Sequence, residues 1–538
     1  MADKIWFLIP ELCLFLGVVV VFVMGLSKHR GVRDAVPAAA ILFLLVAFII
    51  TPFLYTPEHV APDHPLMPML GKYVKMIVCG VGILLALLSV GMIDRRYEDS
   101  VQSGRVRFDP IRANRGEYFS FFLLSLIGVM LCCNANDLIW LFLALELTSL
   151  PTYVMVAMSR PSRKAQEASV KYMFLGAMAA AVMLYGFALL YGATGTIVLT
   201  EMRESFADQA ASEAGIGIMG IIGMLLALLG AGFKIAAAPM HYYAADVYEG
   251  AAAPVTAFLA FVPKTAGMLA IMLLVSIMGW TATETGLPQP IMTMLWIVAI
   301  ITMTLGNIGA LLQRSVKRML AYSSIAHSGY MLIGIIAGPA LTGGRIDGLS
   351  AVLFYLLAYG IMNTAAFAVL SGLERNEQEI ETLEDLAGLR VRYGLMAAVL
   401  SISAGSLLGF PPLLGFVGKL YLFVAGVQAG QIALVVIAGL NSAISAWYYL
   451  GLVKQSVMAR PTPQSETVVR GRVVWPRLAG VLGGLALLVV PIFSQRLITE
   501  AEAVTGVAAG PGEAHAAISP ADQLSTDGLP VREGVESR

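Results

Sequence analysis

Three lysines lie inside long apolar stretches of this chain, where a charged side chain is costly to bury. They are Lys234, Lys264 and Lys419. At membrane depth, a charge is tolerated only against protein or a water-filled cavity. A buried lysine, unlike an arginine, can also give up its proton. The stretch 230–268, which holds the first two lysines, is therefore predicted to be the hydrated centre of an ion path.

Prolines stand beside the first two of these lysines. Because proline has no N–H, Pro239 leaves the carbonyl of Ile235 without its helical partner, one residue from Lys234. Pro263 directly precedes Lys264 and frees another backbone carbonyl in the same way. A charge beside a broken helix is unsuited to facing lipid, so we expect both lysines to face the interior of the protein.

A second proline-broken segment, GFPPLLGFVGKLYLF, carries Lys419 about two turns after Pro411 and Pro412. It belongs to the twelfth predicted helix, whereas Pro239 belongs to the seventh. The two broken helices are five helices apart, which indicates a repeat of five helices. Because five is an odd number, the second copy must cross the membrane in the opposite direction to the first, so the two copies have inverted topology. Paired broken helices of this kind point to a transport site.

Four acids and one histidine complete the titratable set. Glu146 lies about halfway along a predicted span and is the partner we expect for the lysine of the seventh helix. The second half has no matching acid, and His327 is its nearest titratable group. Asp246 and Glu249 are expected in a loop at the cytoplasmic end of the seventh helix, and Glu11 near the outer end of the first.

Each of these residues also has a plainer interpretation. Glu146 and its lysine could form a structural ion pair that joins two helices. Lys264 and Lys419 could serve helix packing alone. His327 could be a hydrogen-bonded histidine at a helix interface. The two acids of the cytoplasmic loop could cap or brace a turn.

The composition places these residues in a membrane protein. The chain has 538 residues, of which 58% are hydrophobic and 13% charged, against about 25% charged in soluble proteins. A net charge of +0 without a basic patch gives no support to nucleic-acid binding. The four cysteines lack metal-ligand spacing and no glycine-rich phosphate loop follows a strand, so we expect buried free thiols and neither a metal nor a nucleotide site.

Fourteen apolar segments are each near the ~20 residues needed to cross the hydrocarbon region. They fall near 5–26, 36–55, 73–93, 118–134, 137–158, 168–192, 216–238, 252–278, 290–312, 319–338, 348–372, 394–425, 430–453 and 474–494. The fold class that follows is an all-α polytopic membrane protein with two inverted five-helix repeats, predicted helices 4–8 and 9–13, and with broken helices 7 and 12.

The basic residues predict the orientation of these helices. Of the 35 Lys and Arg residues, 24 lie in the loops after predicted helices 1, 3, 5, 9, 11 and 13, and eight lie on the other side with both termini. The positive-inside rule then places both termini on the outer side of the membrane.

The chain divides into five parts. Residues 1–116 hold the first three helices and a basic cytoplasmic loop, 117–278 the first repeat, 279–455 the second repeat and 456–495 the final helix. Residues 496–538 are polar, lack periodicity and are predicted to be disordered.

Several motifs in one order resemble the antiporter-like membrane subunits of respiratory complex I, the proton-pumping NADH–quinone oxidoreductase. They are ELTSLPTYVMVA, GFKIAAAPMHYYAADVYEGAAAPVTAFLAFVPKTAG, GNIGALLQRSVKRMLAYSSIAHSGYMLIG and GFPPLLGFVGKLYLF. The similarity covers roughly residues 110–425. A lysine on the twelfth helix is typical of the subunit N and subunit L branches, and the chain lacks the long lateral helix expected of subunit L.

The resemblance implies site residues and a mechanism. The glutamate of the family's fifth helix matches Glu146, and the lysines of its seventh, eighth and twelfth helices match Lys234, Lys264 and Lys419. Burial disfavours a charged ammonium and a close carboxylate favours it, so movement of the carboxylate would switch the first lysine between holding and releasing a proton. The proton would pass on through waters toward His327 and the last lysine.

The resemblance also implies partners. It implies other complex I membrane-arm subunits and membrane lipids, and energy from NADH oxidation by quinone elsewhere in the complex. We expect no cofactor and no redox site in this chain, with flavin, iron–sulfur clusters and quinone in partner subunits. Two alternatives stay open: a subunit of a multisubunit cation/proton antiporter, and a structural membrane subunit without an ion path, whose lysines would tolerate neutral replacement.

Overall fold

The structure is a computed structural model that describes residues 6–55, 67, 69–92, 95–109, 112, 114–280, 286–340, 346–375, 378–471 and 473–505. Nearly all of these residues are helical. The helices and strands are α2 (Ile9–Gly25), α3 (Arg30–Asp34), α4 (Val36–Leu54), α5 (Leu70–Ser89), α6 (Arg95–Gln102), α7 (Arg115–Cys132), α8 (Leu138–Met158), α9 (Arg163–Thr194), α10 (Leu199–Ala211), α11 (Ile218–Lys234), α12 (Tyr243–Gly250), α13 (Ala253–Ser276), α14 (Gln289–Leu311), α15 (Val316–Ala337), α16 (Gly348–Ser371), β1 (Leu373–Arg375), β2 (Gln378–Glu379), η2 (Glu384–Leu386), α17 (Leu389–Leu408), α18 (Leu414–Gln428), α19 (Ile432–Val453), η3 (Lys454–Met458), α20 (Pro463–Glu466), β3 (Val469–Arg470), α21 (Trp475–Val489), η4 (Val490–Phe493) and α22 (Ser494–Thr505).

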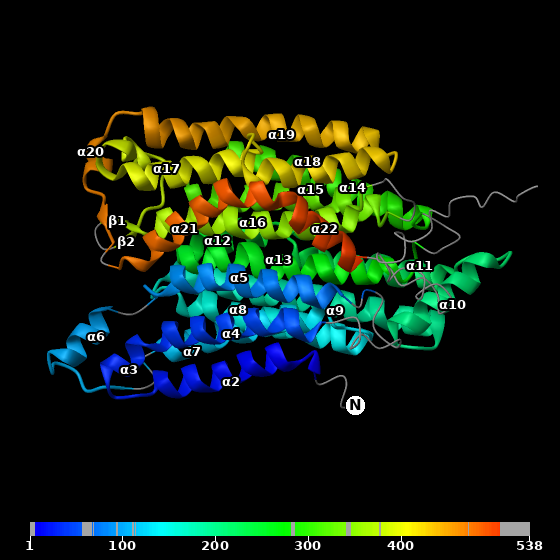
Figure 1. The fold of residues 1–538 in the computed structure, drawn as a ribbon, viewed down its shortest axis with the longest axis horizontal. Helices are drawn as coiled ribbons and strands as arrows, with labels where there is room; N and C mark the ends of the chain where they lie inside the picture. The colour runs from blue at the N-terminus through cyan, green and yellow to red at the C-terminus, as the bar shows by residue number, and fades with distance from the viewer. Residues whose placement is uncertain are drawn as a thin grey trace, which may run out of the picture.

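The all-α membrane fold is confirmed. Within the described residues, twelve helices are long and apolar enough to cross a membrane, and α2, α11 and α18 are shorter apolar helices. Together they account for the fourteen predicted spans, because α17 and α18 are the two halves of the segment 394–425. The long helices run side by side along the longest axis of the molecule (Figure 1).

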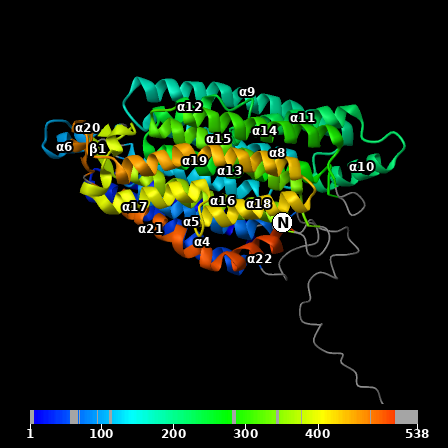
Figure 2. The same cartoon turned by 90° about the horizontal axis from the view of Figure 1, so that it is seen from above.

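The two ends of the bundle differ. The small sheet, of strand order β2-β1-β3, lies with α20 and α6 at one end (Figure 1). The first described residues and the end of α22 lie at the opposite end, as does α10 (Figures 1 and 2). Both ends of the described chain are therefore on one side of the bundle, as the even number of spans predicts.

Side-chain caps begin several of the spans. Asp137 accepts a hydrogen bond from the N–H of Trp140 at the start of α8, and Ser162 and Ser315 cap α9 and α15 in the same way. Such caps satisfy N–H groups that have no partner inside the helix. They fix the starts of three helices that pack around the titratable residues.

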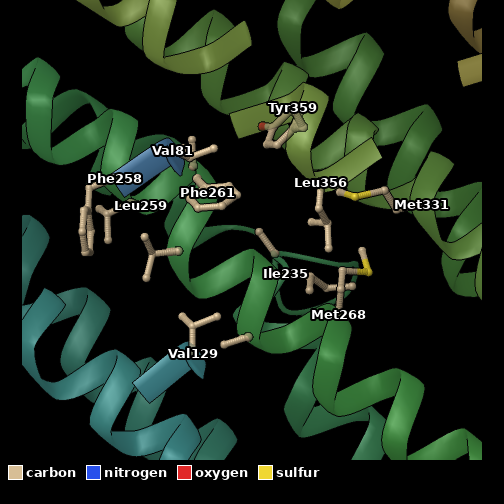
Figure 3. Packing of buried hydrophobic residues seen from close by; sticks show 14 of the residues in the cluster. Val81, Val129, Ile235, Phe258, Leu259, Phe261, Met268, Met331, Leu356 and Tyr359 are labelled. Carbon is tan, nitrogen blue, oxygen red and sulfur yellow. The ribbon is translucent and has the colours of Figure 1, made fainter. Parts of the chain in front are cut away.

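The most buried helices are the ones that carry or surround the predicted site. Every residue of α13 is buried, and α15 and α16 are almost as enclosed. Figure 3 shows Ile235 beside Met268 of α13, with Leu356 and Met331 nearby, all in one apolar cluster. The large exposed apolar side chains lie mainly on outer helices such as α2, α4, α9 and α19. This distribution is expected where lipid covers the outer face of the bundle.

The seventh and twelfth helices are broken as predicted. The first break separates α11 from α12, and the second separates α17 from α18. Asp246 and Glu249 lie on α12, so the expectation that they occupy a loop is wrong: the chain becomes helical again after Pro239. In contrast, α13 continues without interruption through Pro263, so Lys264 lies on an unbroken helix.

The two predicted repeats pack in a similar way. In the first, α7 packs on α8, and a Cβ on Gly128 would lie 2.5 Å from the backbone N of Thr148. In the second, α14 packs on α15, and a Cβ on Gly306 would lie 2.5 Å from the N of Ala326. Each glycine allows close helix approach. These contacts hold α8, which carries Glu146, and α15, which carries His327.

The beginning of the predicted disordered tail is ordered. Residues 496–505 continue α22, whose Ile498 and Ala501 are buried against the bundle. The prediction of disorder is therefore wrong for these residues, because the short apolar stripe of α22 has α16 and α5 to pack on. Residues 506–538 lie outside the described part of the chain.

Candidate ion path

Glu146 and Lys234 form a direct ion pair. The Nζ of Lys234 lies 2.9 Å from Oε1 of Glu146 and donates a second hydrogen bond, 2.6 Å long, to Oγ of Ser149. The lysine side chain is 2% exposed, and the carboxylate side chain is 18% exposed. Since Lys234 is the last residue of α11, its charge also lies at the negative end of that helix.

Neighbouring side chains satisfy the backbone of the first break. Ser328 of α15 donates to the carbonyl of Ile235 at 2.5 Å, the carbonyl that Pro239 was predicted to free. The N–H of Ala238 donates to Oγ1 of Thr302 at 2.9 Å. Ala236 has a positive φ of 55°, which is uncommon for a residue other than glycine. The break is thus held by specific contacts with α14 and α15.

Lys264 lies on the far side of the same serine. Its Nζ donates to Oγ of Ser328 at 2.8 Å and to the carbonyl of Ser324. It also lies 5.3 Å from the centre of the Tyr359 ring, a distance at which a cation is attracted to the ring face. Ser328 therefore touches both the break that follows Lys234 and the ammonium of Lys264, although sequence reasoning missed it.

His327 lies one residue from Ser328 and is enclosed by tyrosines. Its Nδ1 lies 2.7 Å from the hydroxyl of Tyr355, and its Nε2 lies 3.0 Å from the hydroxyl of Tyr449. Its ring also contacts the rings of Tyr330 and Tyr359. Both ring nitrogens therefore have partners that can accept or donate a proton.

Lys419 lies at the second break. It reaches back from α18 to the last carbonyls of α17, donating to Leu408 at 2.9 Å and to Leu407 at 3.3 Å. A third hydrogen bond, 3.2 Å long, joins it to Oγ of Ser442. Its Nζ lies 4.9 Å from the centre of the Tyr330 ring. Both broken helices thus have a buried lysine at the C-terminal end of the first half-helix.

The five predicted residues lie in one row. Four of them follow one another directly, and the fifth, Lys419, is reached through a tyrosine. Glu146 pairs with Lys234, Ser328 links the adjacent backbone to Lys264, and His327 follows on α15. Tyr330 contacts His327 on one side and Lys419 on the other. In the described chain, no carboxylate forms an ion pair with Lys264 or with Lys419. A row of buried amines, hydroxyls and an imidazole can pass a proton over short steps.

Asp246 and Glu249 stand apart from this row. Arg318 lies 2.9 Å from a carboxylate oxygen of each, and Lys171 lies 3.0 Å from Asp246. Both acids are partly exposed and join α12 to the starts of α15 and α9. The contacts fit the bracing role that the sequence left open.

Glu379 forms a further charged cluster that sequence reasoning missed. It pairs with Arg160, and its Oε2 lies 3.2 Å from Nζ of Lys317 and 2.9 Å from the N–H of Ala253. Burial alone would raise its pKa, but the cations Lys317 and Arg160 together lower the pKa below the ordinary value. The cluster ties β2 to the ends of α8, α13 and α15. Its sequence, a short charged loop, gave no signal of this burial.

Glu11 has a partner of its own near the opposite end. Lys75 of α5 is fully buried and lies 2.7 Å from Oε1 of Glu11, and Asn134 donates to the same oxygen at 3.2 Å. In the sequence analysis, Lys75 is one of the eight basic residues counted on the outer side of the membrane. None of these contacts links the pair to the row around Lys234.

No metal site was found in the described part of the chain: no group of three or more His, Cys, Asp and Glu residues is arranged to hold an ion. Cys79, Cys132 and Cys133 are buried free thiols there, and Cys13 is a partly buried one.

Comparison with known proteins places this geometry in a family. The model of the family described as NADH:quinone oxidoreductase/Mrp antiporter, TM, matches residues 135–445. A relative from Trichlorobacter lovleyi named NADH-quinone oxidoreductase subunit N is 44% identical over 342 residues, which are 63% of this chain and 67% of the relative. One of the same name from Myxococcus xanthus is 38% identical over 452 residues, covering 79% of this chain and 82% of the relative.

Solved structures agree with the sequence comparisons. A chain of respiratory complex I from Thermus thermophilus with bound aureothin has a TM-score of 0.71 and 30% identity, covering 92% of this chain and 100% of that one. A chain of the Mrp complex from Dietzia sp. DQ12-45-1b has a TM-score of 0.74 and covers 94% of this chain and 97% of that one, but at 22% identity it supports the fold alone. The chain therefore belongs to the family of antiporter-like transmembrane subunits of NADH:quinone oxidoreductases and Mrp antiporters, within which it groups with the proteins named subunit N.

Proposed function

We propose that the chain is a proton-translocating membrane-arm subunit of an NADH–quinone oxidoreductase. The observation that carries the proposal is the row from Glu146 and Lys234 through Lys264 and His327 to Lys419, buried between the two broken helices. A single buried ion pair would serve a structural role equally well. Lys264 and Lys419 form no ion pair with a carboxylate among the residues that the structure describes. Such lysines are costly to bury and are best accounted for by proton transfer.

The geometry supports a switch at the first pair. While Glu146 is 2.9 Å from Lys234, its negative charge favours the ammonium form. If α8 moved so that the carboxylate withdrew, Lys234 would lose its main stabilising charge and release its proton. Ser328 lies at the next step, since it contacts both the adjacent break and Lys264. His327 and its tyrosines would carry the proton onward toward Lys419.

In this role the chain acts as part of an enzyme but does not carry out the redox reaction. Its relatives are named as subunits of NADH-quinone oxidoreductase, so we infer other complex I membrane-arm subunits as partners. The oxidation of NADH by quinone, with flavin and iron–sulfur clusters, would take place in those partners. The chain would span a bacterial inner membrane with both termini on the outer side, as its basic loops predict.

Purification in mild detergent tests the assignment. An affinity tag on the chain should copurify flavin- and iron–sulfur-containing subunits and quinone-dependent NADH oxidation. The alternative, a subunit of a multisubunit cation/proton antiporter, shares the family description. It predicts membrane partners without redox groups, together with Na⁺-dependent proton exchange in vesicles. Finding only such partners would reject the first assignment.

A further inference from the structure

One cavity lies on the outside of the bundle, away from the row that runs from Glu146 to Lys419. Residues of α17 and α21 line it. Both helices begin near the end of the bundle that holds the small sheet (Figure 1). Its volume is about 410 Å³, within the usual range for small-molecule sites. Arg470, Arg477 and Tyr393 contribute to its lining together with apolar side chains that include Leu395 and Leu478.

The backbone of α17 opens this cavity. Tyr393 has φ −137° and ψ 59°, which interrupts the helix one turn after its start. Gly394 follows, and a Cβ added there would meet no other atom within 4 Å. The interrupted turn and the position without a side chain therefore both lie in the wall of the pocket.

The two arginines give the pocket its charge. The guanidinium of Arg470 lies 5.2 Å from the centre of the Tyr393 ring, which also attracts Arg392 at 5.7 Å. The stem of Arg477 packs close to Gly372. In the part of the chain that the structure describes, no ion pair engages Arg470 or Arg477. Two arginines without an ion-pair partner thus line one cavity. Arginine binds a phosphate group through paired hydrogen bonds.

The surroundings match a membrane boundary. Trp475 is the first residue of α21 and is 48% exposed. Trp and Tyr side chains are enriched at the depth of the lipid headgroups in membrane proteins. Further along the two helices, Leu395 is 62% exposed and Leu478 is 38% exposed. Arg470, Arg477 and Tyr393 thus form a polar rim of the pocket, and Leu395 and Leu478 form an apolar wall beside it.

We propose that this cavity binds an anionic phospholipid of the cytoplasmic leaflet. Its phosphate would lie between Arg470 and Arg477, and its acyl chains would lie along Leu395 and Leu478. Basic pockets between helices on the cytoplasmic side are suited to anionic headgroups. A zwitterionic lipid would bring its own cation and compensate the two arginines less well. Lipid binding at this site does not depend on proton translocation, so it can be tested separately from the proposed function.

Photocrosslinking in native membranes tests the proposal. Phosphatidylglycerol with a photoactivatable acyl chain is compared with the matching phosphatidylcholine, and the tagged full chain is purified with the subunits that accompany it. We expect peptides containing Leu395 or Leu478 to carry about fivefold more phosphatidylglycerol than phosphatidylcholine, because two arginines face the phosphate. Equal labelling by the two lipids, or no labelling because a protein neighbour covers the pocket, would overturn the proposal.

Two variants connect the labelling to the pocket. Arg470→Gln/Arg477→Gln should remove the preference for phosphatidylglycerol. The control Arg105→Gln/Arg107→Gln removes two exposed cations from the loop after α6 and should leave the preference unchanged. If the first double variant accumulates poorly, Leu478→Asp places a repelling carboxylate at an exposed position of the same wall and should have the same effect. Unchanged preference in either variant would contradict the proposal.

Discussion

At the scale of single residues, the account depends on buried amines that have different partners. Lys234 has a carboxylate at 2.9 Å, whereas Lys264 and Lys419 are held by hydroxyl and carbonyl oxygens. Neutral oxygens compensate an ammonium less completely than a carboxylate does. In the proposed function, the first lysine would therefore keep a proton until its partner moves, and the other two would pass one on.

The carboxylate of Glu146 can be tested by two substitutions. Glu146→Gln removes the charge that stabilises the ammonium of Lys234, so proton pumping should fall by about tenfold. Glu146→Asp keeps the charge and loses one methylene of reach, so it should be milder. Both are measured in membrane vesicles at matched subunit levels. Wild-type pumping by the glutamine variant would remove the proposed switch.

Lys419→Arg should not behave as a conservative change. Arginine stays charged at any reachable pH, whereas a buried lysine can deprotonate. The ammonium now fits among the carbonyls of Leu407 and Leu408 and the hydroxyl of Ser442. If Lys419 must release its proton, pumping in reconstituted vesicles should drop about tenfold. Retention of most of the wild-type rate would leave Lys419 as a fixed positive charge.

At the scale of helices, the pattern of proline and lysine predicted the two breaks but not what holds them. The sequence located both breaks correctly, because proline removes a donor wherever it stands. It could not predict that Ser328 takes the freed carbonyl of Ile235, since that contact joins residues 93 positions apart. The sequence also contained no sign that Pro263 differs from Pro239. The helix α13 is continuous through Pro263, whereas the seventh predicted helix is broken at Pro239.

The Glu379 cluster gives a pH-dependent prediction for the contact between β2 and the helix ends. Lys317 and Arg160 hold the pKa of Glu379 below its ordinary value of 4.5. Its charge therefore stabilises the fold above about pH 4.5, and this contribution is lost as the pH falls from there through the folded-state pKa. Glu379→Gln should lower the melting temperature at pH 7 by a few degrees. The difference from wild type should shrink at pH 4.

The matched control for this prediction is Glu384→Gln, an exposed carboxylate in the same connection. It should change the melting temperature little at either pH. A Glu379→Gln variant that melts like wild type at pH 7 would show that the cluster does not hold the helix ends together.

At the scale of the whole molecule, the even number of spans places both ends of the described chain on one side (Figure 1). The sequence predicted the spans well because each is long and apolar. It misjudged residues 496–505, because the packing of a short amphipathic helix on α16 depends on a surface that no local pattern reveals. The burial of Lys75 and the partial burial of Glu379 were missed for the same reason.

The C-terminal segment tests this arrangement. A chain that stops after Thr505 should accumulate and pump normally, whereas one that stops after Phe493 should accumulate less, because it loses the buried residues Ile498 and Ala501. In intact spheroplasts, a protease added outside should cleave the tail after residue 505. Cleavage only in inverted vesicles would reverse the topology.

Lys234→Ala removes the lysine that pairs with Glu146 and so tests the proposed proton path. The measurement is the pH gradient that NADH generates in inverted membrane vesicles, with subunit levels matched by immunoblot and Lys454→Ala as a control for loss of an exposed lysine. Because Lys234 joins Glu146 to the first break, we expect normal assembly, a gradient reduced by about tenfold and slower NADH oxidation. A gradient equal to that of wild type would contradict the account.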